Sequence, residues 1–173
     1  MKHVILTIFL FIFTLGCQAT IITGEIEYNT ETAREEVFSS PLTPISFEFI
    51  REHLFDADLE ENLNAISLGV QELSDRRVVG FSDGSYGIVY YDDPLYSWYY
   101  KGGKLINFTK KSSEAYPCKT IKYKPDGTVA NTGYKISKEE SFIFTSDGKL
   151  IAHWKGKYCL DENDNIIMTR KNL

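Results

Sequence analysis

The sequence is poor in the residues from which reactive sites are built. Cysteine and histidine each occur only three times in 173 residues. No cluster of these residues with carboxylates has the spacing of a zinc site, and no nucleophile has a base beside it in a recognisable motif. We therefore predict no catalytic residue, no metal and no cofactor.

The histidines are expected to be structural. His153 lies in a predicted strand, where alternation places it on one face with Ile151 and Lys155 rather than with Leu150. A catalytic histidine also needs an orienting carboxylate and a substrate or nucleophile within reach. Neither His153 nor His53 has such neighbours in the sequence.

Long hydrophobic runs are scarce, and the main one covers residues 4–15 behind Lys2. A membrane span needs about 20 apolar residues, so this run is too short for a transmembrane helix. A positive start followed by a short apolar run is typical of a signal peptide, which we assign to residues 1–19. The protein is then expected to be exported, either periplasmic or lipid-anchored to the cell envelope.

Two cleavage sites compete at the end of this segment. Residues 14–17 (TLGC) resemble a bacterial lipobox, which would make Cys17 a lipidation site and associate the protein with a membrane. Residues 17–19 (CQA) instead resemble a site of the A-x-A type, which would release a soluble protein after Ala19. Both alternatives stay open.

The charges are divided between two parts of the chain. Residues 20–66 contain eleven acidic and two basic residues, whereas residues 97–158 contain twelve lysines and five acidic residues. This asymmetry predicts either a basic face for an anionic partner or an acidic segment that docks on the lysine-bearing sheet of the same molecule. We favour the second explanation. We expect no nucleic acid as a partner, because the lysines are spread over several turns and are not clustered with arginine.

The first part of the mature chain predicts an acidic tether followed by two helices. Residues 20–42 have no sustained apolar period. Thr43 and Pro44 suit the N-cap and first position of a helix. Asp58 begins a second helix, whose apolar residues recur at steps of four and three up to Leu73. We expect this α-hairpin, at about 43–73, to pack on a sheet within a single domain, 43–173.

From Arg77 onward the apolar period changes to two and turn signals recur. Asp-Gly and Gly-Gly pairs supply the positive φ angles that tight hairpins need. The predicted fold class is α+β, a short α-hairpin packed on a long antiparallel β-meander of about seven to nine strands over 77–171. The predicted turns lie at 83–84, 102–103, 126–127, 147–148 and, with a weaker signal, 163–164.

Three of these hairpins resemble a known class of repeats. The stretches YKPDGTV at 123–129, FTSDGKL at 144–150 and WYYKGGKL at 98–105 are similar to the short hairpin repeats of MORN-type and YwqK-type proteins. The resemblance covers residues 98–167 and implies an elongated β-meander. The likeness to YwqK-type proteins also implies an antitoxin-like or inhibitory role.

Aromatic residues are abundant between positions 86 and 100, and they form the predicted ligand site. Exposed rings could stack on a sugar, with carboxylates at the rim, whereas buried rings would simply be core. The core interpretation is the stronger one, and the turn at 92–94 is the best candidate for a binding loop. The candidate ligand-binding residues are Tyr91, Asp92, Asp93, Tyr96, Trp98 and Tyr100.

Cys118 and Cys159 are the cysteines that lie within the predicted sheet. A simple meander places their strands three apart, about 14 Å at roughly 4.8 Å per step. A disulfide needs Cα atoms within about 7 Å. We therefore expect two free, packed thiols.

Together these features favour a noncatalytic binding or structural module of the bacterial cell envelope, with an unknown protein or glycan as its partner. The alternatives are an envelope hydrolase with an aromatic glycan-binding cleft, in which Asp92 and Asp93 would act, and the antitoxin-like role.

Overall fold

A computed structural model describes residues 28–66 and 70–170. These residues form one antiparallel sheet whose strands are paired in sequence order, which confirms the predicted α+β fold with a long meander. The sheet is larger than predicted, because it begins at Val70 rather than Arg77. Its eleven strands are β1 (Val70–Glu72), β2 (Arg76–Gly80), β3 (Ser85–Tyr90), β4 (Tyr96–Lys101), β5 (Lys104–Lys111), β6 (Cys118–Tyr123), β7 (Val129–Lys135), β8 (Glu140–Phe144), β9 (Leu150–Lys155), β10 (Tyr158–Leu160) and β11 (Ile166–Thr169).

Four of the predicted turns share one hydrogen-bond pattern. In the turns 81–85, 124–128, 145–149 and 161–165, the first N–H donates to the fifth carbonyl and the fourth N–H donates to the first carbonyl. The fourth residue of each has a positive φ, which glycine adopts without strain. In the last turn Asp164 takes this place, with φ 61°. The Gly102–Gly103 turn is tighter, since Lys101 and Lys104 pair directly across it.

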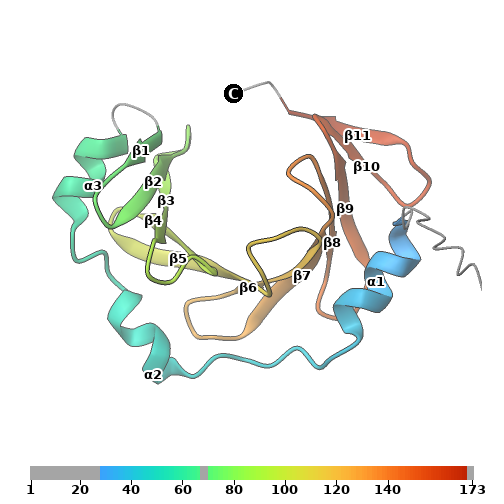
Figure 1. Cartoon of the computed structure of the whole chain (residues 1–173), viewed down its shortest axis with the longest axis horizontal. Helices are drawn as coiled ribbons and strands as arrows, with labels where there is room; N and C mark the ends of the chain where they lie inside the picture. Colours follow the sequence, from blue (N-terminus) through green and yellow to red (C-terminus); the bar gives the residue numbers. More distant parts are fainter. Residues whose placement is uncertain (1–27, 67–69, 171–173) are drawn as a thin grey trace, which may run out of the picture.

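The sheet curves into a trough with an inner and an outer face (Figure 1). Pairing shifts by one residue in β4–β5, β6–β7, β8–β9 and β10–β11, so that one residue of the later strand bulges out. Bulges of this kind bend a strand and increase its twist. The recurrent bulges therefore provide a local cause for the curvature.

A helix lies within the segment predicted as an acidic tether. Helix α1 (Thr30–Phe38) begins at Asn29, which forms a capping box with Thr32. Ala33 and Val37 of α1 are fully buried against the outer face of β7 and β8. The tether prediction is therefore wrong for this part, because two apolar residues one helical turn apart are too weak a signal in an acidic sequence. Residues 20–27 lie outside the described residues.

The predicted α-hairpin is also shorter and later than expected. Residues 43–46 are not helical, and helix α2 (Phe47–Ile50) follows, continued by the 3-10 helix η1 (Arg51–His53). The Ile45 N–H donates to the Gly127 carbonyl (3.0 Å), a tertiary contact that uses the backbone at the predicted first turn. Helix α3 (Leu59–Ile66) ends before the predicted limit at Leu73, and Val70 already belongs to β1.

The helices cover two separate hydrophobic clusters on the outer face. One joins α2 and α3 to the outer face of β2 to β6, with Ile50, Tyr86, Trp98 and Phe108 at its centre. The other joins α1 to β7, β8 and β9. The connection between them, residues 39–46, is called the strap below and runs along the outer side of the sheet (Figure 1). No helix in the described part of the chain is long and apolar enough to span a membrane.

Candidate functional site

Two residues of the predicted aromatic site are buried in the core. Trp98 and Tyr100 are each 1% exposed. The Trp98 ring stacks on His53 at 3.7 Å and on Phe108 at 4.8 Å, beneath the helical layer. A ligand cannot reach either residue in this structure. Tyr96 is half-buried beside them, with its ring 5.2 Å from that of Phe49.

The other predicted site residues lie at the surface, around the turn between β3 and β4. Asp92 and Asp93 are exposed, and Tyr91 donates from its hydroxyl to Glu72. Ligand binding by this turn stays a prediction. The lipidation site Cys17 and the alternative cleavage site after Ala19 lie outside the described residues.

His153 shares a face with Lys155, as predicted, but this is also the face of Leu150, from which it was expected to be separated. Phe142 pairs with His153, and the rings stack at 3.9 Å on the outer face. The predicted separation from Leu150 is wrong because Ile151 is the bulged residue of β9, so strict alternation is interrupted between Leu150 and His153. The carboxylate partner of His153 was not predicted either: Glu140 Oε1 lies 2.9 Å from His153 Nε2.

The pair of His153 and Glu140 borders a polar cavity of about 410 Å³ that Tyr28 and Glu162 also line. Such a pair can serve catalysis only if the imidazole offers a nitrogen to the substrate. Nε2 is engaged by Glu140, and Nδ1 is buried without a hydrogen-bond partner among the described residues. In this arrangement the histidine acts as a packed structural group. Residues 28–66 and 70–170 contain no group of three side chains suited to hold a metal.

The two cysteines of the sheet are free and buried, as predicted. They lie on β6 and β10, which are four strands apart rather than three. Burial raises the pKa of the Cys118 thiol, while Lys111 and Lys135 lower it by a smaller amount. Both thiols are therefore packing groups of the inner face.

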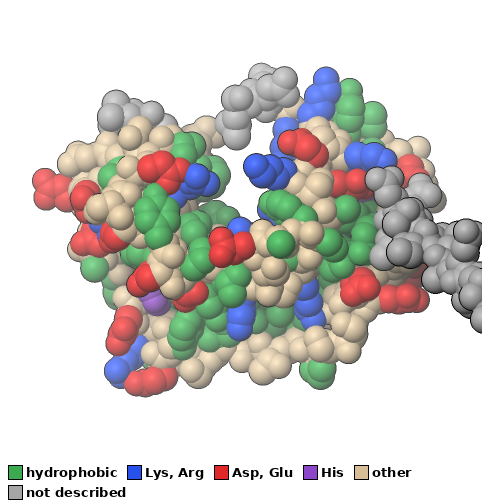
Figure 2. All heavy atoms as spheres, viewed as in Figure 1, with side chains coloured by type: hydrophobic (Ala, Val, Ile, Leu, Met, Phe, Trp, Pro, Cys, Tyr) green, Lys and Arg blue, Asp and Glu red, His purple; other side chains and the backbone are tan. Residues whose placement is uncertain are grey.

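The inner face of the trough carries the most distinctive chemistry of the molecule. Register places Lys111 opposite Thr120, Thr109 opposite Lys122, and Cys118 opposite Lys135, all with side chains on this face. Figure 2 shows Lys and Arg side chains, together with a few carboxylates, around the hollow between the two arms of the sheet. A concavity of about 210 Å³ in the floor is lined by Ser97, Tyr99, Thr109, Lys111, Thr120, Lys122, Asn131, Thr132, Lys135 and Ile143.

The lysines of this floor have no carboxylate partner in the part of the chain that the structure describes. Among the described residues, a single one of the twelve lysines in 97–158 has a carboxylate within 4.0 Å, namely Lys101 with Asp83. Burial lowers the pKa of Lys135, and Lys111 and Arg170 lower it further by repulsion. The floor of the trough therefore has an excess of positive charge.

Carboxylates of the acidic segment form their ion pairs with arginines. Asp58 and Glu61 of the α3 region pair with Arg76, and Glu31 and Glu48 pair with arginines of their own helices. The favoured explanation of the charge asymmetry, an acidic segment that docks on the sheet of the same molecule, agrees with the structure as far as the docking goes. The segment lies on the outer face and is held by apolar contacts and by the ion pairs with Arg76, and none of its described carboxylates lies within 4.0 Å of a described lysine.

Comparison of the chain with family models, curated proteins and solved structures finds no match. The likeness to MORN-type and YwqK-type hairpins stays a prediction, and so does the antitoxin-like role that it implies.

Proposed function

We propose that the protein is an exported, noncatalytic binding module that holds a carboxylate-bearing glycan on the inner face of its curved sheet. The observation that carries this proposal is the convergence of Lys111, Lys122 and Lys135 on a concave floor that no described carboxylate lines.

The arrangement suits an extended anionic chain better than a single ion. The three lysines stand on three neighbouring strands, β5, β6 and β7, and the register places Lys122 and Lys135 four residues apart along the strand direction. At about 3.4 Å per residue and about 4.8 Å per strand, their Cα atoms span roughly 14 Å. Between them, the side chains of Thr109, Thr120 and Asn131 can exchange hydrogen bonds with sugar hydroxyls. A concave surface of one charge sign also attracts an oppositely charged partner over a distance of about one Debye length.

The proposed location of the protein in the cell is part of the same proposal and is inferred from the sequence. The signal-like segment at 1–19 supports export to the envelope, where acidic glycans are accessible to a protein held at a surface or free in the periplasm.

The test is calorimetric titration of the protein with polygalacturonate, and with dextran as an uncharged polysaccharide. We expect salt-dependent binding of polygalacturonate alone. The triple variant Lys111→Gln, Lys122→Gln, Lys135→Gln should weaken this binding by roughly 3- to 150-fold, since three exposed ion pairs at about 0.2–1 kcal/mol each contribute roughly 0.6–3 kcal/mol together.

The matched control changes three exposed lysines outside the floor, Lys124→Gln, Lys138→Gln and Lys149→Gln, and so removes the same net charge. Equal weakening by both triple variants, or equal affinity for dextran, would show that the inner face is not the binding surface.

A further inference from the structure

The strap follows β6 across the outer face of the sheet and is attached to it at three points. Lys119 Nζ donates to the Ser40 Oγ (3.1 Å) and to the Ser40 carbonyl (3.4 Å). The Tyr123 hydroxyl donates to the Thr43 carbonyl (3.3 Å), and the Ile45 N–H donates to the Gly127 carbonyl. The strap is therefore a fixed part of the structure, held by side chains of β6 and by the turn that follows it.

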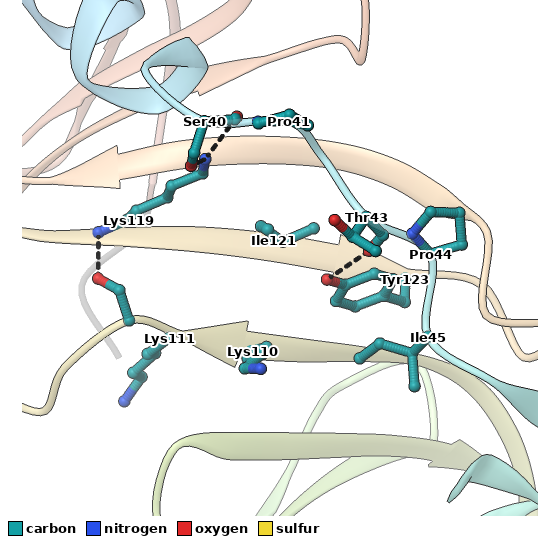
Figure 3. Close-up of a pocket in the computed structure, with 11 residues that line it drawn as sticks. Ser40, Pro41, Thr43, Pro44, Ile45, Lys110, Lys111, Lys119, Ile121 and Tyr123 are labelled. Carbon is teal, nitrogen blue, oxygen red and sulfur yellow. Dashed lines mark hydrogen bonds between the residues drawn. The ribbon is translucent and has the colours of Figure 1, made fainter. Parts of the chain in front are cut away.

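A pocket of about 320 Å³ lies between the strap and the sheet (Figure 3). It lies at the edge of the cluster beneath α2 and α3, since Tyr123 belongs to that cluster and Ile45 and Ile121 pack against it. Its apolar wall is made by Pro41, Pro44, Ile45, Ile121 and the Tyr123 ring. Lys110 and Lys119 border it from neighbouring strands, and Lys111 lies at its end.

Lys110 and Lys119, the two lysines beside the apolar wall, have no anionic partner among the described residues. Within the described part of the chain, the hydrogen bonds of the Lys119 ammonium go only to the neutral oxygens of Ser40. Burial lowers the pKa of Lys119. Lys110 is exposed and lies over the Tyr96 ring at 5.5 Å. Neither has a carboxylate within 4.0 Å in the described part of the chain. An ammonium group beside an apolar wall is stabilised by an anion that replaces its lost hydration.

We propose that this pocket is a second binding site, and that it takes a small monocarboxylate with an apolar body. The carboxylate would lie between Lys110 and Lys119, and the apolar body would pack on Ile45 and Ile121. The volume is near the lower end for ligand sites, which fits a small molecule rather than a polymer. This site is on the outer face and shares only Lys111 with the floor proposed for the glycan, so that its carboxylate contacts, Lys110 and Lys119, are separate from that proposal.

The test is an NMR titration of backbone amides with 3-phenylpropionate, and with 3-phenyl-1-propanol as its uncharged analogue. We expect shifts at Ile45, Lys119, Ile121 and Tyr123 with the carboxylate, and weaker binding of the alcohol. The variant Lys110→Gln should weaken the binding of 3-phenylpropionate by about tenfold, because it removes one charge-assisted hydrogen bond. Because the Lys110 side chain is exposed, this variant keeps the fold, which its own amide spectrum verifies.

Lys119→Gln should also weaken the binding of 3-phenylpropionate, and Lys122→Gln on the inner face should leave that affinity unchanged. The proposal is overturned by equal affinity for the alcohol, by wild-type affinity in Lys110→Gln, by shifts centred on Ser97 and Thr109 of the inner face, or by no shifts up to about 10 mM ligand.

Discussion

At the scale of residues, the core beneath the helical layer contains a buried polar group in addition to the predicted apolar stripe, of which Leu59, Ile66 and Leu73 pack on the core. Asn62 is fully buried, whereas Leu63, which the apolar period favoured, is 42% exposed. The Asn62 amide donates to both oxygens of Asp56 (2.9 and 3.0 Å), and the Tyr86 hydroxyl donates to Asp56 Oδ2 (2.6 Å). Apolar periodicity could not predict this network, because its members come from a loop, a helix and a distant strand.

The variant Tyr86→Phe should reduce the free energy of unfolding by about 1.5–3 kcal/mol, because it removes a buried hydrogen bond to a charged acceptor. The matched variant Tyr91→Phe removes a hydroxyl that donates to the exposed carboxylate of Glu72, and it should change stability by less than about 0.5 kcal/mol. Urea unfolding measures both. Equal losses in the two variants would contradict a stabilising role for the Asp56 network.

At the scale of elements, the turns were predictable and the helix boundaries were not. Asp-Gly and Gly-Gly determine a turn through the local backbone, so each predicted pair lies at a strand connection. No helix starts directly after Thr43, because the strap contacts the turn at Gly127 there. Helix α1 forms because Ala33 and Val37 are buried against the sheet. Such tertiary contacts override weak local preference.

Gly127 and Gly84 offer a matched test of the strap contact. Both have the same place in the same turn, with φ of 82° and 79°. A Cβ at Gly84 would meet nothing within 4 Å, so Gly84→Ala should cost about 1–2 kcal/mol for the backbone conformation alone. A Cβ at Gly127 would lie 2.0 Å from the Ile45 carbonyl oxygen.

Gly127→Ala must therefore displace the strap as well. We expect it to reduce the free energy of unfolding by at least about 1 kcal/mol more than Gly84→Ala does, which is the value of one hydrogen bond. Thermal or urea unfolding of the two variants provides the comparison. If they lose equal stability, the strap is not held at this turn.

The turn carboxylates predict how stability depends on pH. Hydrogen bonds from the hydroxyls of Ser85, Thr128 and Thr145 lower the pKa values of Asp83, Asp126 and Asp147 below the ordinary 3.8. A lowered pKa in the folded state means that the unfolded chain binds protons more readily. The stabilisation is therefore fully present above 3.8 and is lost as the pH falls through the lowered values.

Urea midpoints measured from about pH 6 to about pH 2 should decline over the acidic part of this range. The decline should be smaller in the triple variant Asp83→Asn, Asp126→Asn, Asp147→Asn, whose turns have no carboxylate to protonate. An identical decline in the variant would assign the acid sensitivity to other groups.

At the scale of the whole molecule, the fold separates two kinds of surface that the sequence interleaves. The outer face receives the helices, the aromatic core and the ion pairs of Arg76, whereas Lys111, Lys122 and Lys135 of the inner face have no carboxylate partner among the described residues. The sheet and its turns could be predicted from the chain alone. The candidate site could not, because the bulges at Ile106 of β5 and Ala130 of β7 reverse the alternation that assigns a side chain to a face.

The central claim, that the inner lysines form the binding surface, is tested most directly by the rates at which individual lysines are acetylated. Mass spectrometry would compare these rates with and without saturating polygalacturonate. The account predicts slower acetylation of Lys111, Lys122 and Lys135, with unchanged rates at the exposed control residues Lys124, Lys138 and Lys149. Uniform slowing of all six lysines, or protection of the control residues alone, would contradict it.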